Sequence, residues 1–456
     1  MSKTKRILSA TLALTMAVMS FCSCGSNSVS IKETERTNNS EPSVNLNSDR
    51  NENNSFEPKG NIQILGQPVE REKAFPAVPD ELADSLYNFA FKSSSAVLTG
   101  AEYEGVNRCY SPLSAYYAMA MLTEAADNQT REELAELLGY RGDSLSADMN
   151  TLTTSLLSAS NYDGERTTDI RNSLWLSQRY EFNSEYCAKM GENFDAFIAA
   201  LDFTSFEANE AIASWIADGT HGLIEPSPES FEFDIDTLAV LVNTIFYEGA
   251  WTDNLSDSYE DTFTLADKSE VTADFMKGYY ESAYVTDDFV ATNIPLSDGS
   301  KFTVVLPDED VDINSVLQSE ELYKCATTYD DIKTYDVYLT IPKFDISAKF
   351  DLKQTFESLG VEEAFNGDVA DFSPLTTDPY ERGEGIEVSK IVQEARFSID
   401  EEGCTGAAYT MVVMDACTAA PMDPPPRLDI ECDRPFIFCL SRGDSILFIG
   451  AVENPA

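Results

Sequence analysis

The sequence predicts an α+β domain in which helices come early along the chain and strands come late. Apolar residues recur at helical spacing in the first part of the globular region. β-Branched and aromatic runs bounded by Gly, Pro and Asp follow in the second half. No repeat and no regular alternation of strand and helix is visible, which argues for a long-stranded sheet rather than a parallel βαβ arrangement.

The early helices begin and end at recognisable residues. Apolar positions between 82 and 90 predict a helix that starts near Val78. Ser111-Pro112 predicts the start of a second helix, because Ser caps free N–H groups and Pro suits the first turn. A third helix is expected to open at Thr130 and to end at Gly139.

The later part of the chain changes to a strand pattern. The expected strands are residues 237–247, 301–306, 337–344, 386–399, 436–440 and 446–452. Together with the helices, they predict one α+β domain from residue 75 to residue 456.

The N-terminus has the features of an export signal. Lys3, Lys5 and Arg6 precede an apolar run, residues 7–21, that is too short to span a bilayer comfortably. Residues 1–23 are therefore expected to be a signal peptide.

Cys24 is the expected lipid-modified residue, since its setting resembles that of bacterial lipoproteins. Cys22 is the alternative acceptor, and plain secretion is the remaining possibility. Residues 24–74 are rich in Asn, Ser and Glu and poor in aromatics, so we expect a flexible tether there. The protein is accordingly expected outside the cell, either lipid-anchored at the surface or secreted, with the membrane reached only through the anchor.

Composition excludes several functional classes. The chain has 79 acidic and 31 basic residues and a net charge of -48, which argues against nucleic acid and anionic membrane surfaces as partners. Nine scattered cysteines without a CxxC pair, and a single histidine, do not support a metal site or a disulfide framework. We expect no cofactor.

Nothing in the sequence supports an enzyme. A Ser-His-Asp hydrolase needs a histidine base, and His221 is the only histidine, in a Gly-flanked segment without any GxSxG motif. We interpret His221 as a turn residue. Carboxylate pairs carry no information in a chain with so many acids.

The segment from Ile399 to Met414 is the most informative part of the chain. Small residues occupy 403–408, and on the face that begins with Cys404 every second residue up to Met414 is small or apolar. A segment that slips between two existing strands needs small side chains at its leading end. The alternative is a short edge strand in a Gly/Ala-rich loop, which would leave this alternation to chance.

Several motifs in this order resemble the serpin family over roughly residues 79–456. They are NRCYSPLSAYYAMAML, LVNTIFYEGAW, TVVLPDE, VYLTIPKFDI, DLKQTFESLGVEEAF, ADFSPLT, IDEEGCTGAA, DRPFIFCL and ILFIGAVENP. The resemblance implies a fold of three β-sheets with eight or nine helices and an exposed reactive-centre loop. It also implies a suicide inhibitor, in which the cleaved loop inserts as a new central strand and carries the acylated protease with it.

The resemblance also assigns roles to individual residues. The implied hinge of the loop consists of Glu401, Glu402, Gly403, Cys404, Thr405, Gly406, Ala407 and Ala408. The implied residues at and beneath the opening of the sheet are Ser111, Ser114, Asn243, Trp251 and Gln393. Gln393 stands where many members have a histidine, and Cys404 stands where Thr or Ser is usual. We expect slower loop insertion from these departures but not its loss.

Counting from Glu401 by the family's usual spacing places the cleaved bond between Cys417 and Thr418. The loop is longer than in familiar members, and a count from its other end reaches Pro424 instead. Small residues around Cys417 suit a shallow specificity pocket, so the expected partner is an elastase-like or subtilisin-like serine protease. Residues 143–162 contain no Lys or Arg, so heparin is not expected to bind.

Two other functions remain open at this point. A non-inhibitory member of the family would act as a binding module, and a solute-binding lipoprotein would share the signal, Cys24 and the tether. The first is opposed by the small residues of the hinge, and the second explains nothing after residue 400. We expect a monomer in either case.

Overall fold

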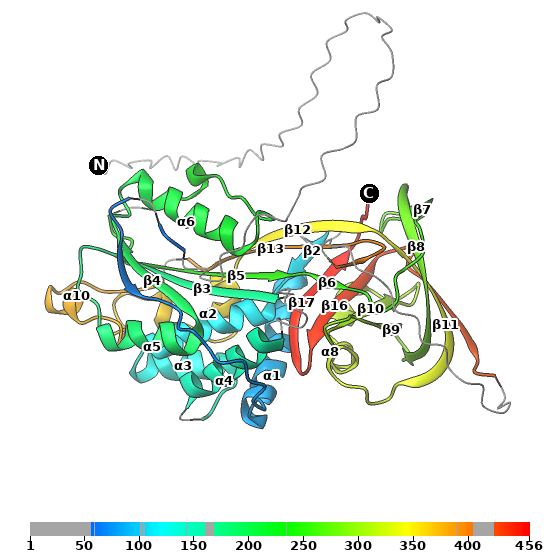
Figure 1. The fold of residues 1–456 in the computed structure, drawn as a ribbon, viewed down its shortest axis with the longest axis horizontal. Helices are drawn as coiled ribbons and strands as arrows, with labels where there is room; N and C mark the ends of the chain where they lie inside the picture. Colours follow the sequence, from blue (N-terminus) through cyan, green and yellow to red (C-terminus); the bar gives the residue numbers. More distant parts are fainter. Residues whose placement is uncertain are drawn as a thin grey trace, which may run out of the picture. The chain divides into compact units, whose positions relative to one another are not determined.

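The computed structural model describes residues 56–58, 60–100, 103, 105–142, 144–159, 168–233, 235–388, 390–404 and 424–456. Phe56 to Ala456 belong to one unit. Within the described residues the chain forms three β-sheets and ten α-helices (Figure 1). The three sheets confirm the predicted α+β fold. The helix count exceeds the expected eight or nine, since α7, α9 and α10 have only five, six and four residues.

The strands divide into one large sheet and two smaller ones. The first small sheet has the order β1 (Gln63–Gly66), β4 (Ala196–Leu201), β3 (Thr168–Ser177) and β5 (Ala239–Tyr247). The second has the order β12 (Phe344–Asp351), β13 (Val392–Ile399), β14 (Gly403–Cys404) and β6 (Gly249–Ala250). The large sheet runs β15 (Arg427–Glu431), β11 (Lys333–Pro342), β8 (Glu270–Val285), β9 (Phe289–Pro295), β10 (Lys301–Pro307), β16 (Phe436–Arg442), β17 (Ser445–Val452) and β2 (Arg108–Tyr110), with β7 (Tyr259–Thr264) paired to β8.

Helices follow the predicted order and cover the sheets. They are α1 (Asp80–Leu98), α2 (Pro112–Ala125), α3 (Asn128–Leu138), α4 (Leu145–Ala159), α5 (Ser184–Phe194), α6 (Phe206–Gly219), α7 (Ile313–Leu317), α8 (Glu320–Thr327), α9 (Lys353–Ser358) and α10 (Asp378–Glu381). Ser111 caps α2 by accepting from the Ser114 N–H, with Pro112 in the first turn, as predicted. Gly139 ends α3 with φ 71°, a left-handed conformation that suits glycine.

Strand β3 lies between two layers of helices. Its residues Ile170, Leu174 and Leu176 join the main core with α2 and α5, whereas Trp175 packs against α6 through Ile212 and Trp215. Because successive side chains of a strand point to opposite faces, β3 contributes buried residues to the core on both sides of the sheet. Figure 1 shows α6 on one side of β3, β4 and β5, with α2 and α5 on the other.

Most of the predicted strands are confirmed. Residues 239–247, 301–307, 436–442 and 445–452 are strands, and residues 337–344 fall on the end of β11 and the start of β12. The strand expected from residue 386 begins only at Val392. Residues 386–388 and 390–391 do not continue it, and they lie beside a cavity described below.

The tether predicted for residues 24–74 is wrong in its last part. Residues 63–66 form strand β1, which pairs antiparallel with β4. Composition alone missed this strand because it is held by contacts with distant residues and not by a hydrophobic run of its own.

Candidate functional site

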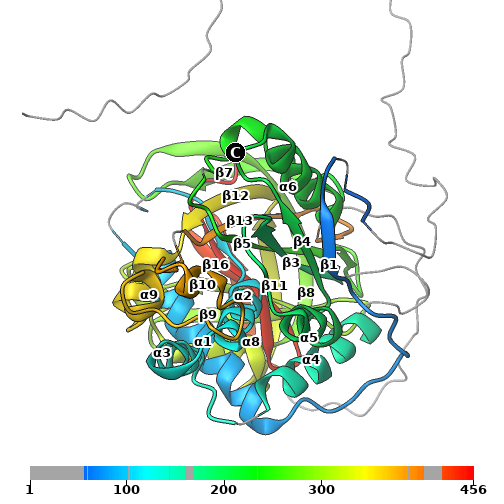
Figure 2. The same ribbon diagram turned by 90° about the vertical axis from the view of Figure 1, so that its left-hand side faces the viewer.

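The site is a gap between strands β5 and β13, which we call the slot. In the described part of the chain β5 and β13 belong to different sheets and share no ladder of hydrogen bonds. They are joined at one end only, where β6 continues the direction of β5 and the two-residue strand β14 lies between β6 and β13. Figure 2 shows β5 and β13 near each other with α2 beneath.

Strand β14 contains the first residues of the predicted hinge that pair with a sheet. Gly403 pairs with Ala250, and Cys404 pairs with Gly249 on one side and with Ile399 on the other. A Cβ atom on Gly403 would lie 2.2 Å from the carbonyl oxygen of Gly249, so only glycine allows this close approach. The hinge therefore enters the sheet with its smallest residue.

Cys404 is fully inside the sheet. It is 1% exposed and belongs to the main hydrophobic core. Burial raises the pKa of its thiol well above the usual value, and Asp400 adds to this effect. The side chain is therefore neutral and acts as a small apolar residue where the family usually has Thr or Ser.

Trp251 holds the turn that precedes β14. Its indole Nε1 donates to the carbonyl oxygen of Asp400 at 2.9 Å, and its backbone N–H donates to that of Glu402 at 3.0 Å. The side chain is 1% exposed and packs edge-on against Phe302 of the large sheet. Trp251 therefore fixes two backbone carbonyl groups of the turn that leads into β14.

Glu401 anchors the same turn through its carboxylate. Oε1 lies 2.6 Å from Nζ of Lys343 and accepts from the Ser258 N–H at 3.3 Å. Burial alone would raise the pKa of Glu401, but the hydrogen bond and the charge of Lys343 prevail and lower it to about 2. The ionised form is therefore the one that holds the turn.

Gln393 connects β13 to the start of α2. Its Oε1 accepts from the Ser111 N–H and its Nε2 donates to the Ser111 carbonyl oxygen, both at 2.9 Å. The Ser111 hydroxyl in turn donates to the carbonyl oxygen of Leu447 at 2.7 Å. An amide that both donates and accepts satisfies the backbone at the place where many members have a histidine.

A second polar chain connects α2 to the other side of the slot. The Ser114 hydroxyl donates to Asn243 of β5, whose amide donates to Asn172 of β3. Asn172 then donates to the carbonyl oxygen of Phe194 at 2.7 Å. Sequence reasoning missed Asn172, although an amide in the middle of an apolar strand is a signal of a buried polar partner.

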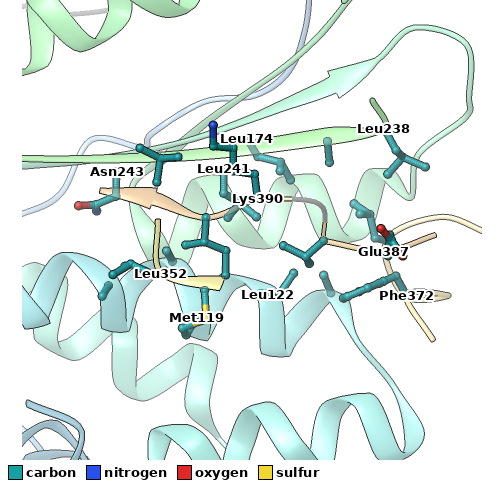
Figure 3. A pocket seen from close by; sticks show the side chains of 18 of the residues that line it. Met119, Leu122, Leu174, Leu238, Leu241, Asn243, Leu352, Phe372, Glu387 and Lys390 are labelled. Carbon is teal, nitrogen blue, oxygen red and sulfur yellow. The ribbon is translucent and has the colours of Figure 1, made fainter. Parts of the chain in front are cut away.

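An apolar cavity of about 70 Å³ underlies the slot. Met119 and Leu122 of α2 form its floor, and Leu174 and Leu241 lie above them (Figure 3). Residues 386–388 and 390–393 complete the other side. The cavity thus lies where a further strand between β5 and β13 would pack its inward side chains.

The connection after α6 bridges the slot close to its joined end. Arg396 of β13 donates to the carbonyl oxygen of Leu223 at 3.1 Å, and the ring of His221 stacks on Phe246 of β5 with centroids 4.2 Å apart. His221 lies in a turn with φ 52°, as predicted, and its Nε2 is 3.2 Å from Asp169. Residues 220–224 therefore contact both β5 and β13 just beyond β14, where an inserted strand would first pass.

Several predicted site residues lie outside the described residues. They are Cys24, Thr405, Gly406, Ala407, Ala408, Cys417 and Thr418. The structure brings together Ser111, Ser114, Asn243 and Gln393 beneath the slot, and Trp251, Glu401, Glu402, Gly403 and Cys404 at its joined end. Within the described residues, no cluster of His, Cys, Asp or Glu suits a metal ion, and no helix is long and apolar enough to cross a bilayer.

The model of the family described as Serpin (serine protease inhibitor) matches residues 84–455. The chain belongs to the serpin family. It is 27% identical over 395 residues to a serine protease inhibitor of Cyanea capillata, covering 83% of this chain and 98% of that protein. It is 26% identical to leukocyte elastase inhibitor A of Mus musculus, covering 76% and 93% of the two chains.

Solved serpin structures share this fold. The thermophilic serpin tengpin in its native state has a TM-score of 0.71 at 22% identity, covering 85% of this chain and 97% of that one. Human thyroxine-binding globulin has a TM-score of 0.68 at 23% identity, covering 82% and 98%. The slot therefore lies in a fold that solved serpin structures share.

Proposed function

We propose that this serpin is a suicide inhibitor of serine endopeptidases, in which the cleaved loop inserts into the slot. The observation that carries the proposal is the direction of β14. It runs antiparallel to both β6 and β13, so a chain that continues beyond Cys404 in the same direction enters the space between β5 and β13. Antiparallel neighbours on both sides satisfy the backbone groups of such a strand.

The register of β14 supports a specific alignment for the inserted strand. Cys404 is opposite Gly249 and Ile399, and continuing this register brings Ala408 opposite Ile245 and Ala395. Two residues further, Thr410 comes opposite Asn243 and Gln393, the two amides that connect β5 and β13 to the start of α2. Residues of the same parity as Cys404 then face the core, which is the face predicted to be small and apolar.

The proposed chemistry uses the protease's own catalytic serine. Its hydroxyl oxygen bonds to the carbonyl carbon of Cys417, the bond to the nitrogen of Thr418 breaks, and the proton passes to the new amine. Insertion of residues 405–416 then carries the acylated enzyme away from its docking position before water hydrolyses the ester. A distorted active site leaves the covalent complex trapped.

We propose an elastase-like or subtilisin-like target. Small side chains flank the Cys417–Thr418 bond, and no basic residue lies between Gly403 and Pro426. The similarity to leukocyte elastase inhibitor A supports the same class. Export through residues 1–23, lipid attachment at Cys24 and a monomeric state are further parts of this proposal, and they rest on the sequence.

Incubation of the domain with neutrophil elastase tests the proposal. We expect an adduct that survives SDS and a released peptide that begins at Thr418, as measured by mass spectrometry. Ala408→Arg places a charge on the inward face of the inserted strand, so we expect cleavage without an adduct. Ala420→Arg is the matched control, since it lies beyond the proposed bond and is not inserted.

Clean cleavage of the unmodified protein, without adduct, would contradict inhibition of this protease. It would favour a non-inhibitory binding protein, the second function considered, for which thyroxine-binding globulin in complex with thyroxine shows that the fold can hold a small molecule. Absence of cleavage by both elastase and subtilisin would reject the proposed specificity.

A further inference from the structure

The outer edge of β4 is entirely apolar. Its sequence is AFIAAL, every residue is buried, and its side chains feed the main core on one face and the α6 cluster on the other. Natural edge strands usually carry Lys, Pro or a bulge that discourages pairing with another chain. β4 has no charge and no proline, so its protection must come from another segment.

Residues 63–66 provide that protection as β1. Gln63 is opposite Ala200, Ile64 is opposite Ala199 and, after an irregularity, Gly66 is opposite Ile198. Figure 2 shows β1 at the edge of the sheet beside β4. This strand lies before the part of the chain that matches the family, residues 84–455.

An aromatic pocket holds the chain just before β1. The ring of Phe56 packs edge-on against Trp175 and Phe197, with centroids 6.4 and 5.6 Å apart. Ile62 packs against the same cluster. Edge-on aromatic pairs of this kind are favourable beyond the burial of their surface.

Two glycines let the segment cross α5 at close range. A Cβ on Gly66 would lie 2.7 Å from the carbonyl oxygen of Cys187, and a Cβ on Gly191 would lie 2.4 Å from that of Gln67. Glycine inside a helix is less favourable than alanine. Gly191 is thus an unfavourable choice for α5 alone, but it is required by the crossing segment.

A polar socket holds the chain after β1. The guanidinium of Arg71 donates to Asn150 and Thr154 of α4 and to the carbonyl oxygen of Glu192, and it lies 3.4 Å from Asp195. Three residues later, the Ala74 N–H donates to the Ser158 hydroxyl at 3.0 Å. One extended segment is therefore held at four successive points. They are the aromatic contacts of Phe56, the pairing of β1 with β4, the close approach of Gly66 to α5 and the hydrogen bonds of Arg71.

We propose that residues 56–74 act as an edge guard: they fill a peptide groove on β4, α5 and α4, and their release lets β4 pair with β4 of a second copy. Two identical edges related by a twofold axis can form an antiparallel ladder, the commonest symmetry of homodimers. The groove accepts an extended peptide with an aromatic residue, a small residue and an arginine at the spacing of Phe56, Gly66 and Arg71. This inference does not depend on protease inhibition.

The full chain with Phe56→Ala and Arg71→Ala tests the guard from the side of the segment. We expect a doubled molar mass by light scattering as the protein concentration rises, while Phe75→Ala stays monomeric. Phe75 is a matched control, since it directly follows the segment and is 67% exposed. A synthetic peptide of residues 56–74 should restore the monomer, and a scrambled peptide should not.

Gly191→Ala tests the guard from the side of the groove, since it blocks the crossing while favouring helix α5. We expect faster hydrogen exchange of the β4 amides in dilute protein and the same dimer in concentrated protein. Monomers with unprotected β4 amides would overturn the proposal, because an open edge would then not pair. Unchanged exchange in both variants, or a dimer that persists with the peptide bound, would also overturn it.

Discussion

Glu401 and Lys343 show how one ion pair can hold the start of the hinge. The pair is separated by 58 positions in sequence, and it connects the turn before β14 to the end of β11. Both side chains are about two-thirds buried, so the pair is only partly screened by water. Its ionisation therefore affects whether Gly403 and Cys404 remain in the sheet.

Acidification should release this anchor. The folded-state pKa of Glu401 is about 2, below its ordinary value of 4.5, so the ionised carboxylate stabilises the folded turn above that value. This stability is lost as the pH falls from about 4.5 toward 2. We expect thermal unfolding to show a stability difference between the unmodified protein and Glu401→Gln that shrinks over this range. Glu402→Gln, at the exposed neighbour, serves as control, and a pH-independent difference would contradict the assignment.

Gln393 should matter for stability because its amide satisfies both backbone groups of Ser111. Gln393→Ala leaves a buried donor and acceptor unpaired, and each such group costs about 1–3 kcal/mol. We expect urea unfolding to show a loss of this order. Gln393→Glu is the informative comparison, since it keeps the acceptor and removes the donor. A loss near zero for Gln393→Ala would mean that water replaces the amide.

The residues of the site were predictable to different degrees. Ser111, Ser114, Asn243 and Gln393 lie together beneath the slot, and Trp251 lies at its joined end. The sequence did not reveal the roles of four other residues at the site, which are Asn172, Lys343, Arg396 and Leu223. Each of these acts through a partner far away in sequence, and a single sequence does not reveal which distant charge or amide folds against which.

At the level of elements, the sequence correctly predicted helix ends that depend on residues close together in the chain. The Ser-Pro start of α2 and the glycine end of α3 depend on neighbours within one turn, and both were predicted. Strand β1 depends on β4, α5 and α4, so its composition was misleading. The segment 386–391 has a strand-like composition but lies beside the open slot, where β5 does not pair with it.

Strand β14 should respond sharply to a change at Gly403. A methyl group there would meet the carbonyl oxygen of Gly249 at 2.2 Å, so Gly403→Ala should expel the two-residue strand from between β6 and β13. We expect Cys404, now 1% exposed, to become reactive toward a thiol reagent. Glu402→Ala, in the exposed turn beside it, should leave Cys404 protected, and a protected Cys404 in Gly403→Ala would contradict this view of β14.

At the level of the whole molecule, we predict that the uncut protein is less stable than the form in which the loop fills the slot. The sheet that contains β5 and the sheet that contains β13 would become one continuous sheet when the cleaved loop fills the space between these two strands. The inserted strand would pair on both sides and cover the cavity of about 70 Å³. Cleavage of one peptide bond should therefore stabilise the protein and not weaken it.

Thermal unfolding of the cleaved protein measures this gain. We expect the melting temperature to rise after a small-residue protease cuts the loop, because the added strand contributes a full set of ladder hydrogen bonds and buried side chains. Ala408→Arg, cut in the same way, should show little rise, because its inward charge opposes entry between Ile245 and Ala395. Equal rises in both proteins would mean that the strand enters in another register, and no rise in either would mean that the slot is not filled by the loop.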